Sequence, residues 1–235
     1  MIKCICFDMD NTLYAESSYY MACYKEIARM ISRDEEETVF ESMLNIRREE
    51  GDKKVFQKII EIYNLDKEYL NKFVNIYRTY DAKILLYPDV EIFIKSKNHD
   101  TKYGILTNGG EFTQKNKIKC LGIEKEFDFI YITGEFLGSK EWKPNKRAFE
   151  LIRNTGLKYS ECIYVGDSFE KDIVGALNVG MNAVLINRDA VYEKCNYNNT
   201  PYWIINSFEQ INNVLNEIEG LTYEKKLRYT YSKVK

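Results

Sequence analysis

Short apolar runs that end in polar residues recur along this chain of 235 residues. Residues 2–8 form the first run, which has little polarity and no helical period, and so predicts a buried strand. Similar runs predict further strands at 103–107, 127–133, 162–167, 182–187 and 202–206. Helical spacing of the apolar residues predicts helices at 112–121, 145–155 and 170–179. Alternating strands and helices are typical of a parallel sheet that helices cover on both faces.

A different pattern fills residues 16–82, where no strand is expected. Apolar side chains recur there at three- and four-residue spacing, as at Tyr20, Tyr24 and Ile27, which predicts about four amphipathic helices. The pattern as a whole therefore predicts an α/β fold with a Rossmann-like parallel sheet and an inserted helical bundle. We expect three parts: an α/β core domain at 1–15 and 83–220, a helical domain at 16–82, and a basic C-terminal tail at 221–235.

Charge and composition exclude several classes of function. The net charge is −2, from 34 basic and 36 acidic residues, so the chain lacks the electrostatic footprint of a protein that binds nucleic-acid polymers. No apolar run reaches the roughly 18 residues of a membrane span, and the N-terminus lacks the pattern of a signal peptide. Three of the six cysteines lie in apolar strand-like runs, which indicates reduced core thiols and a cytoplasmic location.

The chain has one histidine, His99, which lies in the polar stretch KSKNHD. Nucleophilic triads and multi-histidine metal sites are therefore poor candidates for its chemistry. Carboxylates and lysines must carry most of the chemistry instead. The candidate groups gather in four polar motifs at predicted strand ends, which is where sheets of this kind bind their ligands.

The first motif is FDMDNTL. Asp8 ends the first predicted strand, and Asp10 lies two residues later in a turn. Two carboxylates this close should not both stay ionised without a cation. Because magnesium prefers oxygen ligands, the motif predicts a Mg²⁺ site at this strand end.

The second and third motifs offer groups that bind anions. Thr107 and Asn108 in ILTNGG supply a hydroxyl, an amide and loop N–H groups. Lys143 in KEWKPNKRAF supplies an ammonium group, and it precedes Pro144, which we expect in the first turn of a helix.

The fourth motif, VGDSFEKD, adds Asp167 at a strand end and Asp172 five residues later, which completes an oxygen-rich metal site. The four motifs together suit phosphoryl transfer. The metal and the lysine would neutralise a phosphate group, so that a carboxylate could attack it. Aspartate is a known nucleophile in aspartyl-phosphate chemistry.

The segments FDMDNTLY, ILTNG, KPNKRAF and VGDSFEKDIVGALNVGM together resemble the haloacid dehalogenase-like (HAD) superfamily of phosphohydrolases, over about residues 2–218. The resemblance implies that Asp8 is the nucleophile, that Asp10 is the general acid and base, and that Thr107 and Lys143 bind phosphate. It also implies that the helical block at 16–82 is a cap domain.

The resemblance further implies how Mg²⁺ is held: by the Asp8 side chain, the Asp10 backbone carbonyl and Asp167, with Asp172 as a ligand or just behind the ligands. Dehalogenases of the superfamily carry, at the position of Asp10, a residue that cannot act as this acid. Phosphate esters are therefore favoured over halides.

Residues 113–133 are similar to the branch of pyrimidine 5′-nucleotidases and phosphoglycolate phosphatase-like proteins. The expected partner is a small phosphate ester, such as a nucleoside monophosphate or a sugar phosphate, bound by a monomer or a small homo-oligomer. Two alternatives stay open. One is a phosphotransferase, such as a sugar phosphate mutase. The other is a phospho-accepting regulatory domain, against which Asp10 and the inserted helices argue.

Two lysines compete for the third motif. Counting forward from Thr133 with the family's usual spacing points nearer to Lys140, whereas counting back from the following helix points to Lys143. We favour Lys143, because Pro144 has a fixed φ and holds the preceding residue extended at a defined place.

Overall fold

The computed structural model describes residues 1–220, and every structural statement below refers to that part of the chain. The chain divides into two compact units. The first unit contains Met1–Tyr14, Leu86–Glu111 and residues 123–220. The second contains Ala15–Leu85 and Phe112–Gly122. The second unit thus includes a helix at 112–121 that the sequence analysis assigned to the α/β domain.

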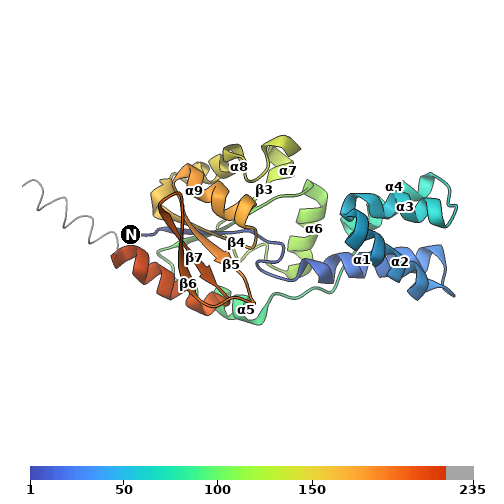
Figure 1. The fold of residues 1–235 in the computed structure, drawn as a ribbon, viewed down its shortest axis with the longest axis horizontal. Coiled ribbons are helices and arrows are strands. Elements are labelled where there is room, and N and C mark those ends of the chain that lie inside the picture. The colour runs from blue at the N-terminus through green and yellow to red at the C-terminus, as the bar shows by residue number, and fades with distance from the viewer. Residues whose placement is uncertain (221–235) are drawn as a thin grey trace, which may run out of the picture. The chain divides into compact units, whose positions relative to one another are not determined.

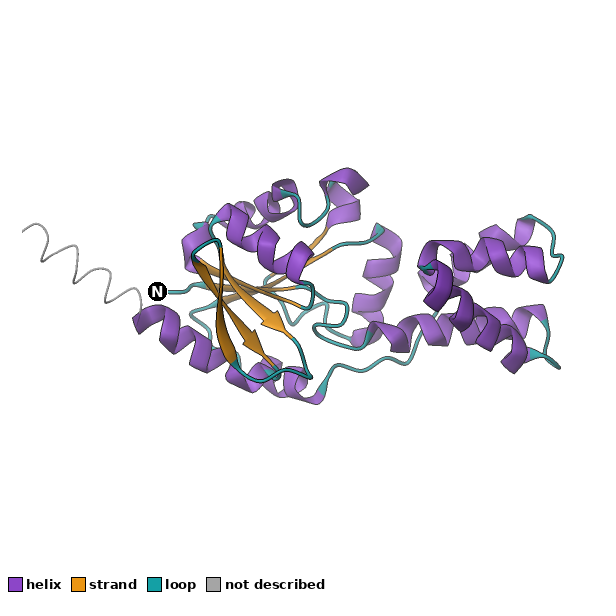
Figure 2. Cartoon of the chain, viewed as in Figure 1, coloured by secondary structure: helices purple, strands orange, loops and turns teal. Residues whose placement is uncertain are grey.

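A seven-stranded sheet forms the centre of the first unit (Figure 2). Its strands are β1 (Cys4–Phe7), β2 (Lys102–Thr107), β3 (Phe129–Ile132), β4 (Cys162–Gly166), β5 (Asn182–Ile186), β6 (Glu193–Tyr197) and β7 (Thr200–Ile205). Their order is β3-β2-β1-β4-β5-β7-β6, and each neighbouring pair is parallel except the antiparallel pair β6–β7. The predicted Rossmann-like sheet is confirmed, whereas β6 was not predicted.

The register of the central strands brings three strand ends together. Phe7, the last residue of β1, pairs with Ile105 of β2 on one side and with Val165 of β4 on the other. Asp8, Thr107 and Asp167 lie one or two residues beyond these positions. The polar motifs of three strands therefore meet at the carboxyl edge of the sheet.

Helices cover both faces of this sheet, as predicted (Figure 1). The helices of the first unit are α5 (Pro88–Lys95), α7 (Thr133–Phe136), α8 (Lys146–Glu150), α9 (Gly175–Val179) and a last helix over residues 211–220. On one face, the ring of Phe149 from α8 packs edge-on against Tyr164 of β4 at 5.2 Å. On the other face, Phe7 stacks on Phe208 at 5.4 Å and contacts Phe93 of α5 at 5.6 Å.

Two predicted helices are less regular than expected. The segment predicted at 145–155 begins as α8 and continues as a 3₁₀ helix over Leu151–Thr155. The segment predicted at 170–179 begins as a π-helix, η5 (Phe169–Val174), and continues as α9. The expectation that Pro144 lies in a first helical turn is wrong, because α8 begins only at Lys146, after Asn145.

The second unit consists of helices, as expected for residues 16–82. They are α1 (Glu16–Ile31), α2 (Glu36–Glu50), α3 (Val55–Ile62) and α4 (Glu68–Thr79). The unit also includes α6 (Glu111–Leu121), which comes later in the chain. Apolar side chains at helical spacing, such as Ile27, Val39 and Phe73, are buried in one cluster and hold α1, α2, α3 and α4 together.

The predicted basic tail at 221–235 lies outside the described residues. In the part of the chain that is described, no helix has both the length and the low polarity needed to cross a membrane.

Candidate active site

Asp8 is the first residue beyond β1, and its backbone is held in place. Its N–H donates to the carbonyl of Val165 at 2.8 Å, which continues the pairing of β1 with β4. The residue is 7% exposed, so its carboxyl group is largely removed from water. Asp10 follows in the turn and is less buried, and the hydroxyl of Tyr14 donates to its Oδ1 at 2.6 Å.

Lys143 brings the third motif to the same place. Its Nζ donates to Oδ1 of Asp8 and to Oδ1 of Asp172, both at 2.7 Å, and to the hydroxyl of Tyr164 at 2.6 Å. Only 5% of the residue is exposed. Lys140, by contrast, is exposed within the 3₁₀ segment Ser139–Glu141. Of the two lysines that compete for the third motif, the structure brings Lys143 to the carboxylates.

The side chain of Asn108 fixes the backbone of Lys143. Its Oδ1 accepts from the N–H of Lys143, and its Nδ2 donates to the carbonyl of Lys143, both at 3.0 Å. From its sequence motif, Asn108 is expected only to bind an anion. Thr107, one residue earlier, is 1% exposed at the end of β2. Asn108 of the second motif therefore holds the backbone of Lys143 in the third motif.

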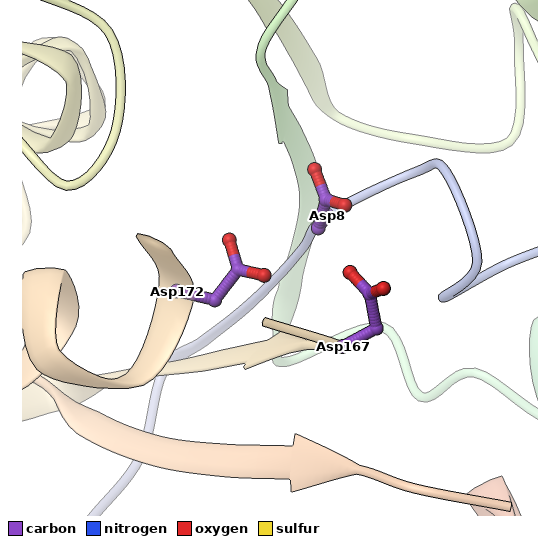
Figure 3. Close-up of side chains that lie close together, drawn as sticks. All are labelled: Asp8, Asp167 and Asp172. Atoms are coloured by element: carbon purple, nitrogen blue, oxygen red, sulfur yellow. The ribbon is translucent and has the colours of Figure 1, made fainter. Parts of the chain in front are cut away.

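Three carboxyl groups converge from separate elements (Figure 3). Asp8 follows β1, Asp167 follows β4, and Asp172 lies in η5. Each offers one oxygen atom, and these three atoms lie within 4.8 Å of one another. Such a spacing lets one cation touch more than one carboxylate.

Burial and the neighbouring carboxyl groups make ionisation of Asp8 and Asp167 less favourable than usual, which their pKa values reflect. Burial raises the pKa of Asp8 to about 8; Lys143 acts against this rise, while Asp172 and Asp10 add to it. Burial, with a contribution from Asp172, raises the pKa of Asp167 to about 6. Burial alone would lower the pKa of Lys143, but Asp172 and Asp8 outweigh it and raise that pKa. The lysine therefore stays charged, and the carboxylates need further positive charge.

The donor set fits a divalent cation of the magnesium type. When all three carboxyl groups are ionised, they and the one ammonium leave two negative charges, which is the charge that such a cation balances. All the ligand atoms are oxygens, which magnesium prefers. Asp172 is the least available of the three, since its Oδ1 accepts from Lys143 and its Oδ2 accepts from the N–H of Ser168 at 3.0 Å. Asp8 and Asp167 are therefore the better candidates for side-chain ligands.

Sequence reasoning missed two tyrosines of this site, Tyr14 and Tyr164. Tyr164 lies in the middle of the buried run CIYVGD, and its hydroxyl is fully enclosed between Lys143 and the carbonyl of Leu106. A hydroxyl inside a buried strand must find a partner, and that was the signal in the sequence. Which partner it finds depends on a loop about twenty residues away in sequence, at Lys143.

A family model described as haloacid dehalogenase-like hydrolase matches residues 5–186. A curated relative, the glyceraldehyde 3-phosphate phosphatase of Methanocaldococcus jannaschii, is 30% identical over 93% of this chain and 99% of its own length.

Solved structures show the same fold. A HAD phosphatase from Thermococcus onnurineus is similar with a TM-score of 0.64 and 26% identity, over 91% of this chain and 98% of that chain. A 2-haloacid dehalogenase from Pseudomonas syringae has a TM-score of 0.63 at 20% identity, over 92% of this chain and 99% of that chain. Fold similarity alone therefore does not separate phosphatases from dehalogenases. The ordered motifs at the sheet edge, together with the match over most of the sequence, establish that the chain belongs to the haloacid dehalogenase-like hydrolases.

Proposed function

We propose that this chain is a Mg²⁺-dependent phosphatase that hydrolyses small phosphate monoesters through an aspartyl phosphate on Asp8. One observation carries the proposal: the buried ammonium of Lys143 lies between Asp8 and Asp172, while Asp167 approaches Asp8 from the next strand. This arrangement supplies a fixed carboxylate and fixed positive charge at one edge of a sheet. The phosphatase activity by which the relative from Methanocaldococcus jannaschii is named supports the same class of reaction.

In the proposed first step, a carboxylate oxygen of Asp8 attacks the phosphorus atom of the substrate. The bond from phosphorus to the ester oxygen breaks, and that oxygen takes the proton of the Asp10 carboxyl group. In the second step the Asp10 carboxylate accepts a proton from water as the water oxygen attacks the phosphorus. Inorganic phosphate leaves, and the carboxylate of Asp8 is restored.

The remaining residues of the site hold charge and position. Thr107 would bind an oxygen of the transferred phosphoryl group. Lys143, whose N–H donors are taken up by Asp8, Asp172 and Tyr164, would stabilise that group through its positive charge. Mg²⁺, held by Asp8, Asp167 and the backbone carbonyl of Asp10, would neutralise negative charge on that group. Asp172 accepts from Lys143 and from Ser168, so we assign it to positioning the lysine.

The substrate is proposed to be a small phosphorylated metabolite, and glyceraldehyde 3-phosphate is the first to test because the relative is named for it. A screen of triose phosphates, sugar phosphates and nucleoside monophosphates with Mg²⁺ would measure phosphate release, with the Asp8→Asn variant as the control. If the variant released phosphate as fast as the wild type, the activity would come from a contaminant, and this result would count against the proposal. The helices at 16–82 are proposed to act as the cap domain and to influence which ester is used.

The same screen separates the two alternative functions. A phosphotransferase would pass the phosphoryl group to a second metabolite and release little inorganic phosphate. A phospho-accepting regulator would take up one equivalent and stop. Steady release of phosphate over many turnovers is the result expected for the phosphatase.

Removing divalent metal is expected to stop turnover. Without a cation, Lys143 alone cannot balance Asp8, Asp167 and Asp172 in their ionised forms, and a phosphate group would add to the repulsion. Treatment with EDTA should reduce phosphate release to the background rate, and added MgCl₂ should restore it. Full activity in metal-free buffer would contradict the assignment of the carboxylates to a metal.

Gly166 is expected to be essential, although it carries no functional group. It ends β4, and a Cβ atom there would clash with the carboxyl group of Asp172. The Gly166→Ala variant should therefore displace Asp172 from Lys143 and lower kcat by about a hundredfold. Gly138→Ala is the matched control, because its Cβ would meet only Glu141 Oε2, at 3.9 Å. Equal activity of the two variants would show that the position of Asp172 is unimportant.

A further inference from the structure

The ammonium of Lys143 has one acceptor that charge balance does not explain. Its three acceptors are a carboxylate oxygen of Asp8, a carboxylate oxygen of Asp172 and the hydroxyl of Tyr164, at 2.7, 2.7 and 2.6 Å. An ammonium group has three N–H donors, so these three acceptors use all of them and fix the orientation of the group. Tyr164 is the one neutral acceptor among the three.

The hydroxyl of Tyr164 is itself fixed in direction. It donates to the backbone carbonyl of Leu106 at 2.7 Å. Because a phenol has a single O–H proton, the oxygen must then present a lone pair to Lys143. Leu106 immediately precedes Thr107 on β2, so the contact also links the lysine to the strand that ends in the second motif.

The ring of Tyr164 has little freedom to move. The side chain is 0% exposed, and the ring packs edge-on against Phe149 at 5.2 Å with an interplanar angle of 72°. Phe149 lies in α8, which begins three residues after Lys143. The strand, the helix and the lysine are thus connected through one side chain.

We infer that Tyr164 is a positioning residue, whose hydroxyl holds the Lys143 ammonium at the point between Asp8 and Asp172 where it meets the phosphoryl group. This inference rests on the proposed function. Without the hydroxyl, one N–H of a buried ammonium loses its acceptor, and the group shifts toward one of the two carboxylates. A small displacement of this kind is enough to slow a reaction that depends on a preorganised charge.

The kinetic test uses Tyr164→Phe, which removes the hydroxyl and keeps the ring against Phe149. With an aryl phosphate and Mg²⁺, kcat and kcat/KM are expected to fall together by about tenfold to a hundredfold, with KM nearly unchanged. Tyr103→Phe is the matched control. Tyr103 is 5% exposed, its ring contacts Phe93 on the opposite face of the sheet, and its hydroxyl accepts from the N–H of Asn98.

A second measurement does not depend on turnover. In protein labelled with ¹⁵N-lysine, the buried and triply bonded ammonium of Lys143 should give a protected NMR signal, assigned by its loss in Lys143→Arg. Tyr164→Phe is expected to broaden or shift that signal, whereas Tyr103→Phe should leave it in place. A merely structural tyrosine would lower the melting temperature without a selective change at Lys143.

The outcomes separate the inference from the proposed function. A changed Lys143 signal in a protein that hydrolyses no phosphate ester would support the positioning role and sink the phosphatase proposal. An unchanged signal, or a Tyr164→Phe enzyme with kcat within about twofold of the wild type, would overturn the positioning role.

Discussion

Replacing Asp8 with asparagine is expected to abolish turnover while the protein stays folded. Asparagine keeps the shape of the side chain and can still accept from Lys143, but its amide oxygen is a poor nucleophile. We expect kcat to fall by at least about ten-thousandfold, as for other enzymes that lose their nucleophile. Initial rates of phosphate release with Mg²⁺ give the loss, and thermal unfolding reports whether the fold survives.

Asp34→Asn is the matched control for this result, since Asp34 is an exposed aspartate that lies before α2 in the helical unit. It should be as active as the wild type. Near-normal activity of Asp8→Asn would remove Asp8 from the mechanism, even if the metal site were intact.

The second large effect is expected at Lys143, and it distinguishes the two candidate lysines of the third motif. Lys143→Ala removes the ammonium that contacts Asp8 and Asp172, so kcat should fall by about a thousandfold. The variant should also be less stable by about 3–5 kcal/mol, because two buried carboxylates lose their counter-charge. Rates should therefore be measured well below its melting temperature.

Lys140→Ala serves as the partner experiment. Lys140 is exposed, and its loss should leave kcat within about twofold of the wild type. If steady-state kinetics ranked the two variants in the opposite order, the catalytic lysine would be Lys140 and the geometry around Lys143 would be structural.

The parallel strands could be predicted from the sequence because their burial leaves a strong signal. β1 and β4 are buried along their whole length, so each reads as a continuous apolar run. β6 gives no such signal, since its residues are partly or fully exposed at the edge of the sheet. The sequence did carry another sign of this strand, two consecutive asparagines, which are residues that favour tight turns. Asn198 and Asn199 have φ of 48° and 61°, as two-residue hairpin turns require.

The polar residues at the strand ends of the candidate site could be predicted, but its two tyrosines and the contacts among its side chains could not. Asp8, Thr107 and Asp167 follow apolar runs, and parallel strands end at the same edge, so local pattern and topology together point to them. The triple contact of Lys143 with Asp8, Asp172 and Tyr164 could not be predicted, because it depends on how a loop packs onto the sheet. For the same reason the sequence predicts an anion-binding role for Asn108, whereas in the structure its amide group holds the backbone of Lys143.

The most direct test of the account is to trap the proposed intermediate. The enzyme would be mixed with Mg²⁺ and a substrate found in the metabolite screen, then quenched with borohydride, which reduces an acyl phosphate to an alcohol. Peptide mass spectrometry would then identify the modified residue. The account predicts homoserine at position 8, present only when substrate and Mg²⁺ are both supplied. Turnover without any modification at position 8, or with the modification at another carboxylate, would contradict it.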